Sequence, residues 1–379
     1  MKYHSRPHNV SPSIETARVI LAVKNFASIP GVCHIGLGVT ATNTLKVLRR
    51  NGIHCEAWPA QTYAELRSKL SAETKKADYT PISHLIVSSP AWIQPSQFKT
   101  LCLLYPEIQF VLLSHSGTAY LSIDKYGIRN LSAGNDLARE VHNFTLAANN
   151  PRSKVAFDAM WGADTVLLPN LYDTSSYVPY TRRQFANHIR VFNPGASRPW
   201  KNQLTAAEAS IMLARRLGVE LKYFVNSKRP DGGERMIESR AELFNTVPVD
   251  TITDIPWEPW PRFRADIAKM HLIMQPSFDE TFDVVAADAA AEGVPCVCTP
   301  AIEWMPRSSW AEPWDPQSVM ATGLALLHDP HAVTDARTHL SAYVKDGTRR
   351  WMDFILKEDD VSSLGSGNGT SHPQRVYPR

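Results

Sequence analysis

Short apolar runs alternate with helically patterned segments along most of this chain. Residues 32–38 (VCHIGLG) precede a helical pattern at 40–52, and residues 53–58 (IHCEAW) form the next apolar run. Further strand-like runs in the first half of the chain cover residues 83–89, 108–117 and 164–170. Because strands alternate with helices, the pattern predicts a parallel sheet that is covered on both faces.

A second series of the same kind begins at residue 188. It runs through a helical pattern to further apolar runs at 219–226, 271–277 and 294–300. A chain of 379 residues, 44% of them hydrophobic, is long enough for two cores. We therefore predict an α/β protein with two Rossmann-like domains, residues 1–175 and 188–330, joined by a polar linker. We expect C-terminal helices at 331–358 to pack back toward the N-terminal domain, and the composition of residues 359–379 predicts a disordered tail.

The composition argues against several other classes of protein. No apolar run reaches the roughly 18 residues that cross a bilayer, and the first residues lack the apolar core of a signal peptide. We therefore expect a soluble, cytoplasmic protein without a transmembrane segment. The five cysteines show no C-x-x-C spacing, which fits free thiols in a reducing compartment. The net charge of +3 is too small to predict a nucleic-acid partner by itself.

A glycine-rich turn follows the first expected strand and opens a helix. Residues 36–41 read GLGVTA, which has the G-x-G-x-x-A spacing of dinucleotide-binding turns, and Glu56 is expected to end the next strand. This combination supports an NAD(P)-dependent oxidoreductase as one interpretation. The other interpretation is an ordinary strand-to-helix turn, which also needs small residues.

The second half of the chain contains the features of an anion site. Arg198 and Lys201 lie in the loop after its first expected strand, just before a helical pattern. Glu280 lies in the loop after a later strand, and it precedes an alanine-rich helix that Asp283 can cap. At the carboxyl ends of parallel strands, helix N-termini offer unpaired N–H groups to anions. Arg198 and Lys201 at the start of a helix would therefore suit a diphosphate, and the other interpretation is a surface loop with two solvated charges.

These motifs resemble the C-terminal donor domain of GT-B glycosyltransferases, specifically the large retaining family with an E-x7-E motif. The segment SRPWKN at 197–202 is similar to the family's Arg and Lys loop, with one residue fewer between the cations. The segment PSFDETFD at 276–283 is similar to P-S-x-x-E-x-F-G, with Asp283 in place of the last glycine. Asp288 stands in place of the second glutamate, and residues 167–173 (LLPNLYD) are similar to the I-P-N-G-V-D that commonly closes the N-terminal domain.

The resemblance implies two domains that face each other across a cleft and transfer a hexosyl or pentosyl group from a UDP- or GDP-linked sugar. It also implies retention of configuration and no metal or other cofactor; the sequence contains no D-x-D metal motif. The implied catalytic residues are His115, Arg198, Lys201 and Glu280. The implied donor-binding residues are Arg198, Lys201, Glu280, Thr281, Phe282, Asp283, Val284 and Asp288, with Asp288 on the ribose. The expected acceptor-binding residues are Gly36, Gly38, Thr40 and His115.

The acceptor and the level of activity stay open on the sequence alone. A sugar chain, a small metabolite, a lipid headgroup and a modified DNA base are all candidate acceptors. The carboxylate of Asp283 would compete with a phosphate at the helix N-terminus, and Asp288 is one methylene shorter than glutamate. A catalytically weak nucleotide-sugar-binding protein is therefore an alternative to the transferase.

Overall fold

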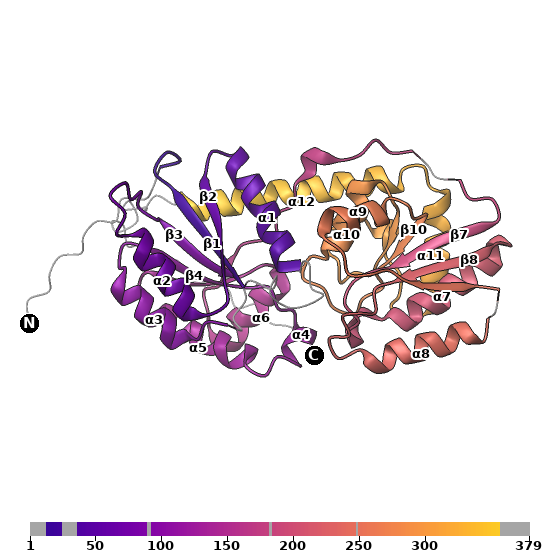
Figure 1. Ribbon diagram of the computed structural model, residues 1–379, viewed down its shortest axis with the longest axis horizontal. Coiled ribbons are helices and arrows are strands. Elements are labelled where there is room, and N and C mark those ends of the chain that lie inside the picture. The colour runs from indigo at the N-terminus through magenta and orange to yellow at the C-terminus, as the bar shows by residue number, and fades with distance from the viewer. Residues whose placement is uncertain (1–12, 25–35, 89–91, 182–183, 248, 357–379) are drawn as a thin grey trace, which may run out of the picture.

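The chain forms two lobes, each built around a parallel β-sheet (Figure 1). The computed structural model describes residues 13–24, 36–88, 92–181, 184–247 and 249–356. The expected tail at 359–379 and most of the expected first strand at 32–38 lie outside these residues. Among the described residues, no helix is long and apolar enough to cross a membrane.

The N-terminal lobe contains a sheet with the strand order β2-β1-β3-β4-β5-β6. Its strands are β1 (Arg18–Lys24), β2 (His54–Ala60), β3 (His84–Ser88), β4 (Gln109–Ser114), β5 (Phe144–Ala148) and β6 (Val166–Leu167). Its helices are α1 (Gly36–Arg50), α2 (Tyr63–Glu73), α3 (Pro95–Leu104), α4 (Thr118–Leu121), α5 (Gly127–Glu140) and α6 (Pro151–Trp161). Alternate residues of β1 enter different cores: Val19 and Leu21 pack with α1, whereas Ile20 and Ala22 pack with α2, α3 and α5. The sheet is therefore covered on both faces, as its alternating pattern predicts.

The C-terminal lobe contains a sheet with the strand order β11-β10-β7-β8-β9. Its strands are β7 (His188–Asn193), β8 (Glu220–Val225), β9 (Thr251–Asp254), β10 (Leu272–Met274) and β11 (Cys296–Val297). Its helices are α7 (Gln203–Leu217), α8 (Glu234–Asn245), α9 (Trp260–Ile267), α10 (Val284–Glu292) and α11 (Pro316–His328). Short 3₁₀ turns lie at η1 (Thr174–Ser176), η2 (Pro199–Lys201) and η3 (Arg307–Ser309). Helices α7 and α11 share one core, and α9 and α10 belong to another, so both faces are covered here too.

Two strands of the N-terminal sheet differ from the sequence-based prediction. The first strand in the structure is β1, which lies before the run at 32–38 that we expected to form it, and Gly36 already begins α1. Strand β5 was not predicted, although its sequence FTLAA is a short apolar run. Short buried strands carry no polar alternation, so their position along a chain is poorly marked.

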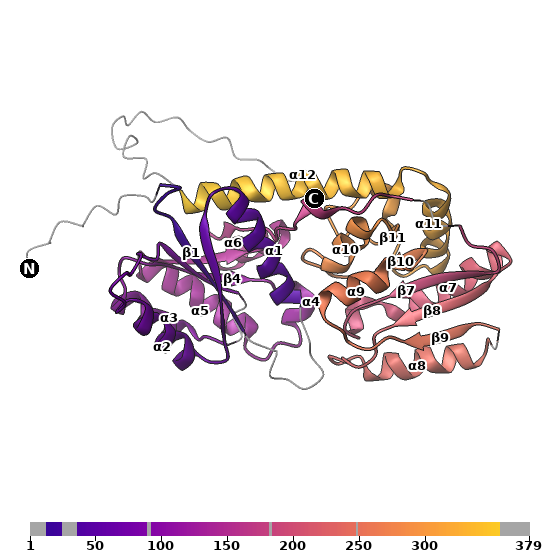
Figure 2. The same cartoon turned by 45° about the horizontal axis from the view of Figure 1, so that its top comes forward.

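Helix α12 (Ala332–Ile355) runs along both lobes, as Figure 2 shows. Its 24 residues span about 36 Å at 1.5 Å per residue. Buried residues recur along it at intervals of three and four, which gives one apolar stripe: Val333, Ala336, Leu340, Val344, Gly347, Trp351 and Ile355. The stripe joins a core that includes residues of β1, α1, α9 and α10, so one hydrophobic cluster crosses the boundary between the lobes.

Candidate active site

A lysine and two carboxylates form a buried cluster at the carboxyl edge of the C-terminal sheet. Lys201 Nζ lies 2.5 Å from Glu280 Oε1 and 3.2 Å from Asp283 Oδ2. Lys201 follows β7, and the two acids follow β10, which pairs with β7 in the sheet. The three residues meet because neighbouring parallel strands end at the same edge. The cluster therefore lies where the sequence predicts a diphosphate site.

Burial dominates the electrostatics of this cluster. It raises the pKa of Glu280 to about 7, against the opposing effect of Lys201. Burial acts to lower the pKa of Lys201, but the charges of Asp283 and Glu280 outweigh it, and the pKa is raised. Lys201 is therefore held as a cation, while burial shifts Glu280 toward its protonated form.

Asp283 caps the N-terminus of α10. Its Oδ1 accepts a hydrogen bond from the backbone N–H of Ala286 at 2.9 Å. This is the capping role that the sequence predicts for Asp283. The same carboxylate reaches Lys201 through its other oxygen, so it joins the helix end to the cation.

Arg198 lies near this cluster but is paired elsewhere. Its Nε and Nη2 donate to Asp231 Oδ2 at 3.1 and 2.8 Å. Its guanidinium carbon lies 5.6 Å from the ring centroids of both Tyr120 and Trp200. No sequence pattern identifies Asp231 or Tyr120 as partners of Arg198, because both are distant from it along the chain. Tyr120 belongs to α4, so this contact reaches across to the N-terminal lobe.

His115 lies at the carboxyl end of β4 and faces the loop that contains Glu280. Its Nδ1 lies 3.3 Å from Asn149 Nδ2, and its carbonyl accepts a hydrogen bond from Thr281 Oγ1 at 3.4 Å. Burial lowers the pKa of His115 to about 4, so the imidazole is neutral at pH 7. Among the described residues, Nε2 has no hydrogen-bond partner. The structure thus brings His115 next to the loop that contains Glu280.

Other contacts across the lobes were not predicted. Asp279 Oδ2 accepts a hydrogen bond from the backbone N–H of Ala119 at 2.8 Å. A Cβ atom on Gly117 would lie only 2.5 Å from the same oxygen, so glycine allows this close approach. Arg152 Nη2 donates to the carbonyls of Glu280 and Ala301 at 2.6 and 2.7 Å. The lobes are therefore held together directly beside the cluster.

Asp288, the residue expected on the ribose, is hydrogen-bonded to other residues of the protein. It is fully buried, and its Oδ1 accepts a hydrogen bond from Tyr172 Oη at 2.6 Å. Trp260 Nε1 donates to both carboxylate oxygens, at 3.1 and 3.0 Å. Burial raises the pKa of Asp288 to about 7. The side chain, one methylene shorter than glutamate, thus contacts the segment that follows β6 and the start of α9.

The other residues that the sequence predicts to bind a donor have different environments. Phe282 is buried, its ring stacks on Tyr343, and its carbonyl accepts a hydrogen bond from Trp304 Nε1 at 2.6 Å. It is a core residue here. Val284 is half-buried at the start of α10, and Thr281 contacts Asn149 at 3.2 Å.

The glycine turn gives little support to the dinucleotide interpretation. Gly36 and Gly38 lie within α1, and a Cβ atom on either would meet no described atom within 4 Å. Thr40 is buried in the same helix. Glu56 lies within β2 and does not end it, and its carboxylate accepts hydrogen bonds from Arg18 at 2.9 and 2.6 Å. The carboxylate of Glu56 is thus engaged by Arg18, and the expectation that Glu56 ends its strand was wrong.

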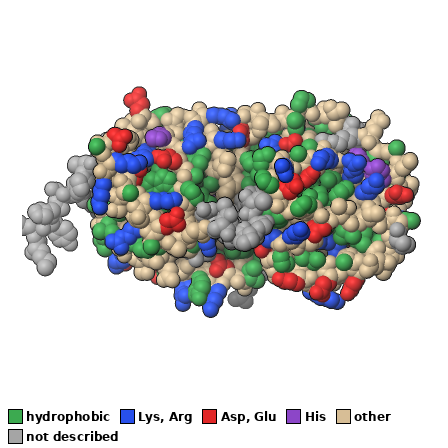
Figure 3. Space-filling view, in the orientation of Figure 1, with side chains coloured by type: hydrophobic (Ala, Val, Ile, Leu, Met, Phe, Trp, Pro, Cys, Tyr) green, Lys and Arg blue, Asp and Glu red, His purple; other side chains and the backbone are tan. Residues whose placement is uncertain are grey.

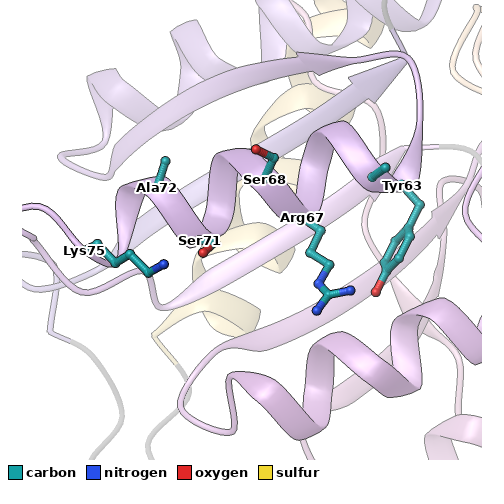
Figure 4. Close-up of a pocket in the computed structure, with 7 residues that line it drawn as sticks. Tyr63, Arg67, Ser68, Ser71, Ala72 and Lys75 are labelled. Atoms are coloured by element: carbon teal, nitrogen blue, oxygen red, sulfur yellow. The ribbon is translucent and has the colours of Figure 1, made fainter.

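A shallow groove lies elsewhere, along α2 of the N-terminal lobe (Figure 4). Its lining residues are Tyr63, Ala64, Arg67, Ser68, Ser71, Ala72 and Lys75. All of them except Lys75, which follows the helix, belong to α2, and none is a carboxylate. We therefore place the candidate active site at the Lys201 cluster, between the lobes.

The comparisons with known proteins bear on the fold. No family model matches the chain, and no curated protein is detectably similar to it in sequence. Several solved structures are similar to this chain over most of their own length. A sucrose-phosphate synthase from Thermosynechococcus elongatus superimposes with a TM-score of 0.64 at 14% identity, over 89% of this chain and 98% of that one.

Two further structures agree with this result. An α,α-trehalose-phosphate synthase (UDP-forming) from Burkholderia vietnamiensis gives a TM-score of 0.60 at 11% identity, over 92% of this chain and 99% of that one. Anabaena HepE, solved in complex with UDP and glucose, gives a TM-score of 0.57 at 15% identity, over 90% of this chain and 97% of that one. The predicted architecture is confirmed: the chain has the GT-B fold, with two Rossmann-like lobes that meet at the Lys201 cluster.

Proposed function

We propose that this protein transfers a sugar from a UDP-sugar to an acceptor. The observation that carries the proposal is the position of Lys201, between Glu280 and Asp283 at the N-terminus of α10; the loop that holds these two acids contacts His115 through Thr281. Several proteins of the same fold bind or release UDP according to their descriptions. The choice of UDP over GDP rests on that analogy of fold.

In the proposed reaction, the leaving diphosphate is stabilised by protein groups. Lys201 is a fixed cation, and Arg198 would join it by exchanging Asp231 for a phosphate. We propose that Glu280 holds hydroxyl groups of the donor sugar and that neutral His115 lies beside the transferred sugar. Retention of configuration, independence of metal and an acceptor side near Gly36, Gly38 and Thr40 remain parts of the proposal that rest on the family resemblance.

The surface gives no reason to prefer a nucleic-acid acceptor. Acidic and basic side chains are interspersed on the face that Figure 3 shows, and the net charge is only +3. We therefore leave the acceptor class unassigned.

A cytoplasmic location is also part of the proposal, because the cysteines Cys55, Cys102, Cys296 and Cys298 are free and buried.

The first test measures release of UDP from UDP-sugars in the presence of EDTA. We expect Lys201→Ala and Glu280→Ala to lower turnover at least about tenfold, because the first removes the cation proposed for the leaving diphosphate and the second removes the carboxylate proposed for the donor sugar. Lys269→Ala is the matched control, since Lys269 is 61% exposed and pairs only locally with Asp266 in α9. A wild-type protein that neither binds UDP nor releases it from any UDP-sugar would refute the proposed function.

A second candidate function has its own supporting observation. Asp283 engages both the helix end and Lys201, and Asp288 is buried, so the site departs from the pattern of active family members. The protein would then bind a nucleotide sugar without transferring it. Tight UDP binding, with no UDP release from a panel of UDP-sugars and acceptors, would favour this function.

A further inference from the structure

Asp283 occupies the place where the chain offers positive charge to an anion. Its Oδ1 accepts a hydrogen bond from the N–H of Ala286 at 2.9 Å, and its Oδ2 lies 3.2 Å from Lys201 Nζ. A helix N-terminus and a lysine are both groups that bind phosphate. One carboxylate of the chain already engages both of them.

We propose that Asp283 is an internal anion that holds the diphosphate subsite when no donor is present, so that the donor must displace this carboxylate to bind. The inference rests on the proposed function, because it concerns the same subsite. It gives Asp283 the role of lowering the affinity for nucleoside diphosphates, instead of the role of a phosphate ligand.

The backbone supports this role. Asp283 has φ 62° and ψ 92°, a conformation that residues with a side chain rarely adopt. Within the described ranges, the non-glycine residues with positive φ are Asn202, Asp231 and Asp283. Asp231 pairs with Arg198, and Asn202 directly follows Lys201. Residues with positive φ thus lie next to Arg198 and Lys201, where carboxylates of the chain pair with these cations.

Burial makes the competition strong. The side chain of Asp283 is 0% exposed and that of Lys201 is 11% exposed, so little water screens their interaction. A phosphate brought to Lys201 would meet a second negative charge at short range, and like charges repel strongly in such surroundings. Removal of the charge at Asp283 would leave Lys201 and the helix N-terminus available to the phosphate.

The experiment compares the binding of UDP to the full-length wild type, Asp283→Asn and Asp283→Gly by isothermal titration calorimetry. Asparagine keeps the size of the side chain and a capping oxygen but removes the charge. Glycine removes the side chain and adopts a positive φ without strain. Uridine, which carries no phosphate, is the matched ligand.

Asp158→Asn is the matched control variant. Asp158 makes the same kinds of contact in the N-terminal lobe: its Oδ2 accepts from Lys154 at 2.6 Å, and its Oδ1 accepts from the N–H of Thr165 at 2.9 Å. Its replacement therefore tests whether the loss of a paired aspartate, by itself, changes the affinity for UDP.

We expect Asp283→Asn and Asp283→Gly to bind UDP at least about tenfold more tightly than the wild type. Their affinity for uridine, and the affinity of Asp158→Asn for UDP, should equal the wild-type values. If the wild type binds UDP and the folded variants bind it no more tightly, the inference is overturned and the proposed function stands. If none of the proteins binds UDP, the proposed function fails and the inference fails with it. Circular dichroism checks folding, and Asp283→Gly decides the result if Asp283→Asn does not fold.

Discussion

At the scale of single residues, two aspartates of the same segment have different surroundings and different consequences. Asp283 begins α10 and reaches Lys201, so its charge bears on ligand binding. Asp288 lies deeper in the helix, is fully buried, and accepts hydrogen bonds from Tyr172 and Trp260. Since Tyr172 follows the N-terminal sheet, Asp288 ties the connection between the lobes to α10. Its charge therefore bears on stability.

Asp288 should make stability depend on pH. Burial raises its pKa from 3.8 to about 7, so the folded chain binds a proton between these values that the unfolded chain releases. The free energy of unfolding contributed by Asp288 therefore falls as the pH rises from about 4 to about 7. Asparagine does not titrate, so Asp288→Asn lacks this pH-dependent contribution. The free energy of unfolding of Asp288→Asn, relative to that of the wild type, should therefore rise over the same pH range, by at most about 4 kcal/mol.

Urea denaturation of both proteins at several pH values between 4 and 7.5 measures this difference. His84 and His115, whose pKa values burial lowers to about 4, oppose the trend in the wild type, but they are common to both proteins and cancel. Parallel stability profiles for the two proteins would show that Asp288 titrates normally in the folded state.

At the scale of elements, α12 joins the two lobes through its apolar stripe. Near its C-terminal end, Trp351 is 2% exposed, and its Nε1 donates to the carbonyl of Pro169 at 2.8 Å. Gly347 lies against the same segment, where a Cβ atom would come within 3.0 Å of Leu171. The ring of Phe354 lies 5.3 Å from that of His84 in β3. The last turns of the helix thus pack on the N-terminal lobe, although the helix begins in the C-terminal lobe.

Trp351→Ala should destabilise the chain strongly. The change removes a large buried side chain and leaves the carbonyl of Pro169 without this donor, which together cost about 3–5 kcal/mol. Chemical denaturation measures the loss. Arg349→Ala is the control, because Arg349 is 62% exposed on the same helix and should change stability by about 0.5 kcal/mol or less. Equal destabilisation by the two changes would mean that α12 does not join the lobes as described.

At the scale of the whole molecule, the lobes meet in a closed arrangement around the Lys201 cluster. Arg152 of α6 reaches the C-terminal lobe at the carbonyls of Glu280 and Ala301, and its Nε lies 2.9 Å from Glu303 Oε1. Asp279 reaches back to the N-terminal lobe at Ala119. Contacts of this kind stabilise a closed state. A ligand that enters between the lobes must either break these contacts or bind a minor population in which they are already broken.

Arg152→Ala should shift the ligand-free protein toward a more open arrangement. The change removes charge-assisted hydrogen bonds that exist only between the lobes, and a loss of about 1–2 kcal/mol would change the open population about 5- to 30-fold. Small-angle X-ray scattering should then give a larger radius of gyration than for the wild type. Lys154→Ala is the control, because Lys154 pairs with Asp158 within α6. Identical scattering from both variants and the wild type would argue against this role of Arg152.

The sequence by itself determined the class of fold and the centre of the candidate site. Hydrophobic periodicity is a local property, so alternating strands and helices predicted two parallel sheets without any knowledge of their contacts. The expectation that Lys201 and Glu280 each follow a strand came in the same way, and parallel strands end at a common edge; the structure showed that the two strands are neighbours. The cap at Asp283 is also local, since it joins residues only three positions apart.

Only the tertiary structure decided which partners these side chains have. Arg198 pairs with Asp231, Asp288 with Tyr172, and Glu56 with Arg18, and each pair is separated by tens of residues or more. The closed arrangement of the lobes likewise depends on single contacts between distant segments. Such contacts leave no periodic pattern in a sequence, because they arise from where the chain returns in space and not from the order of its residues.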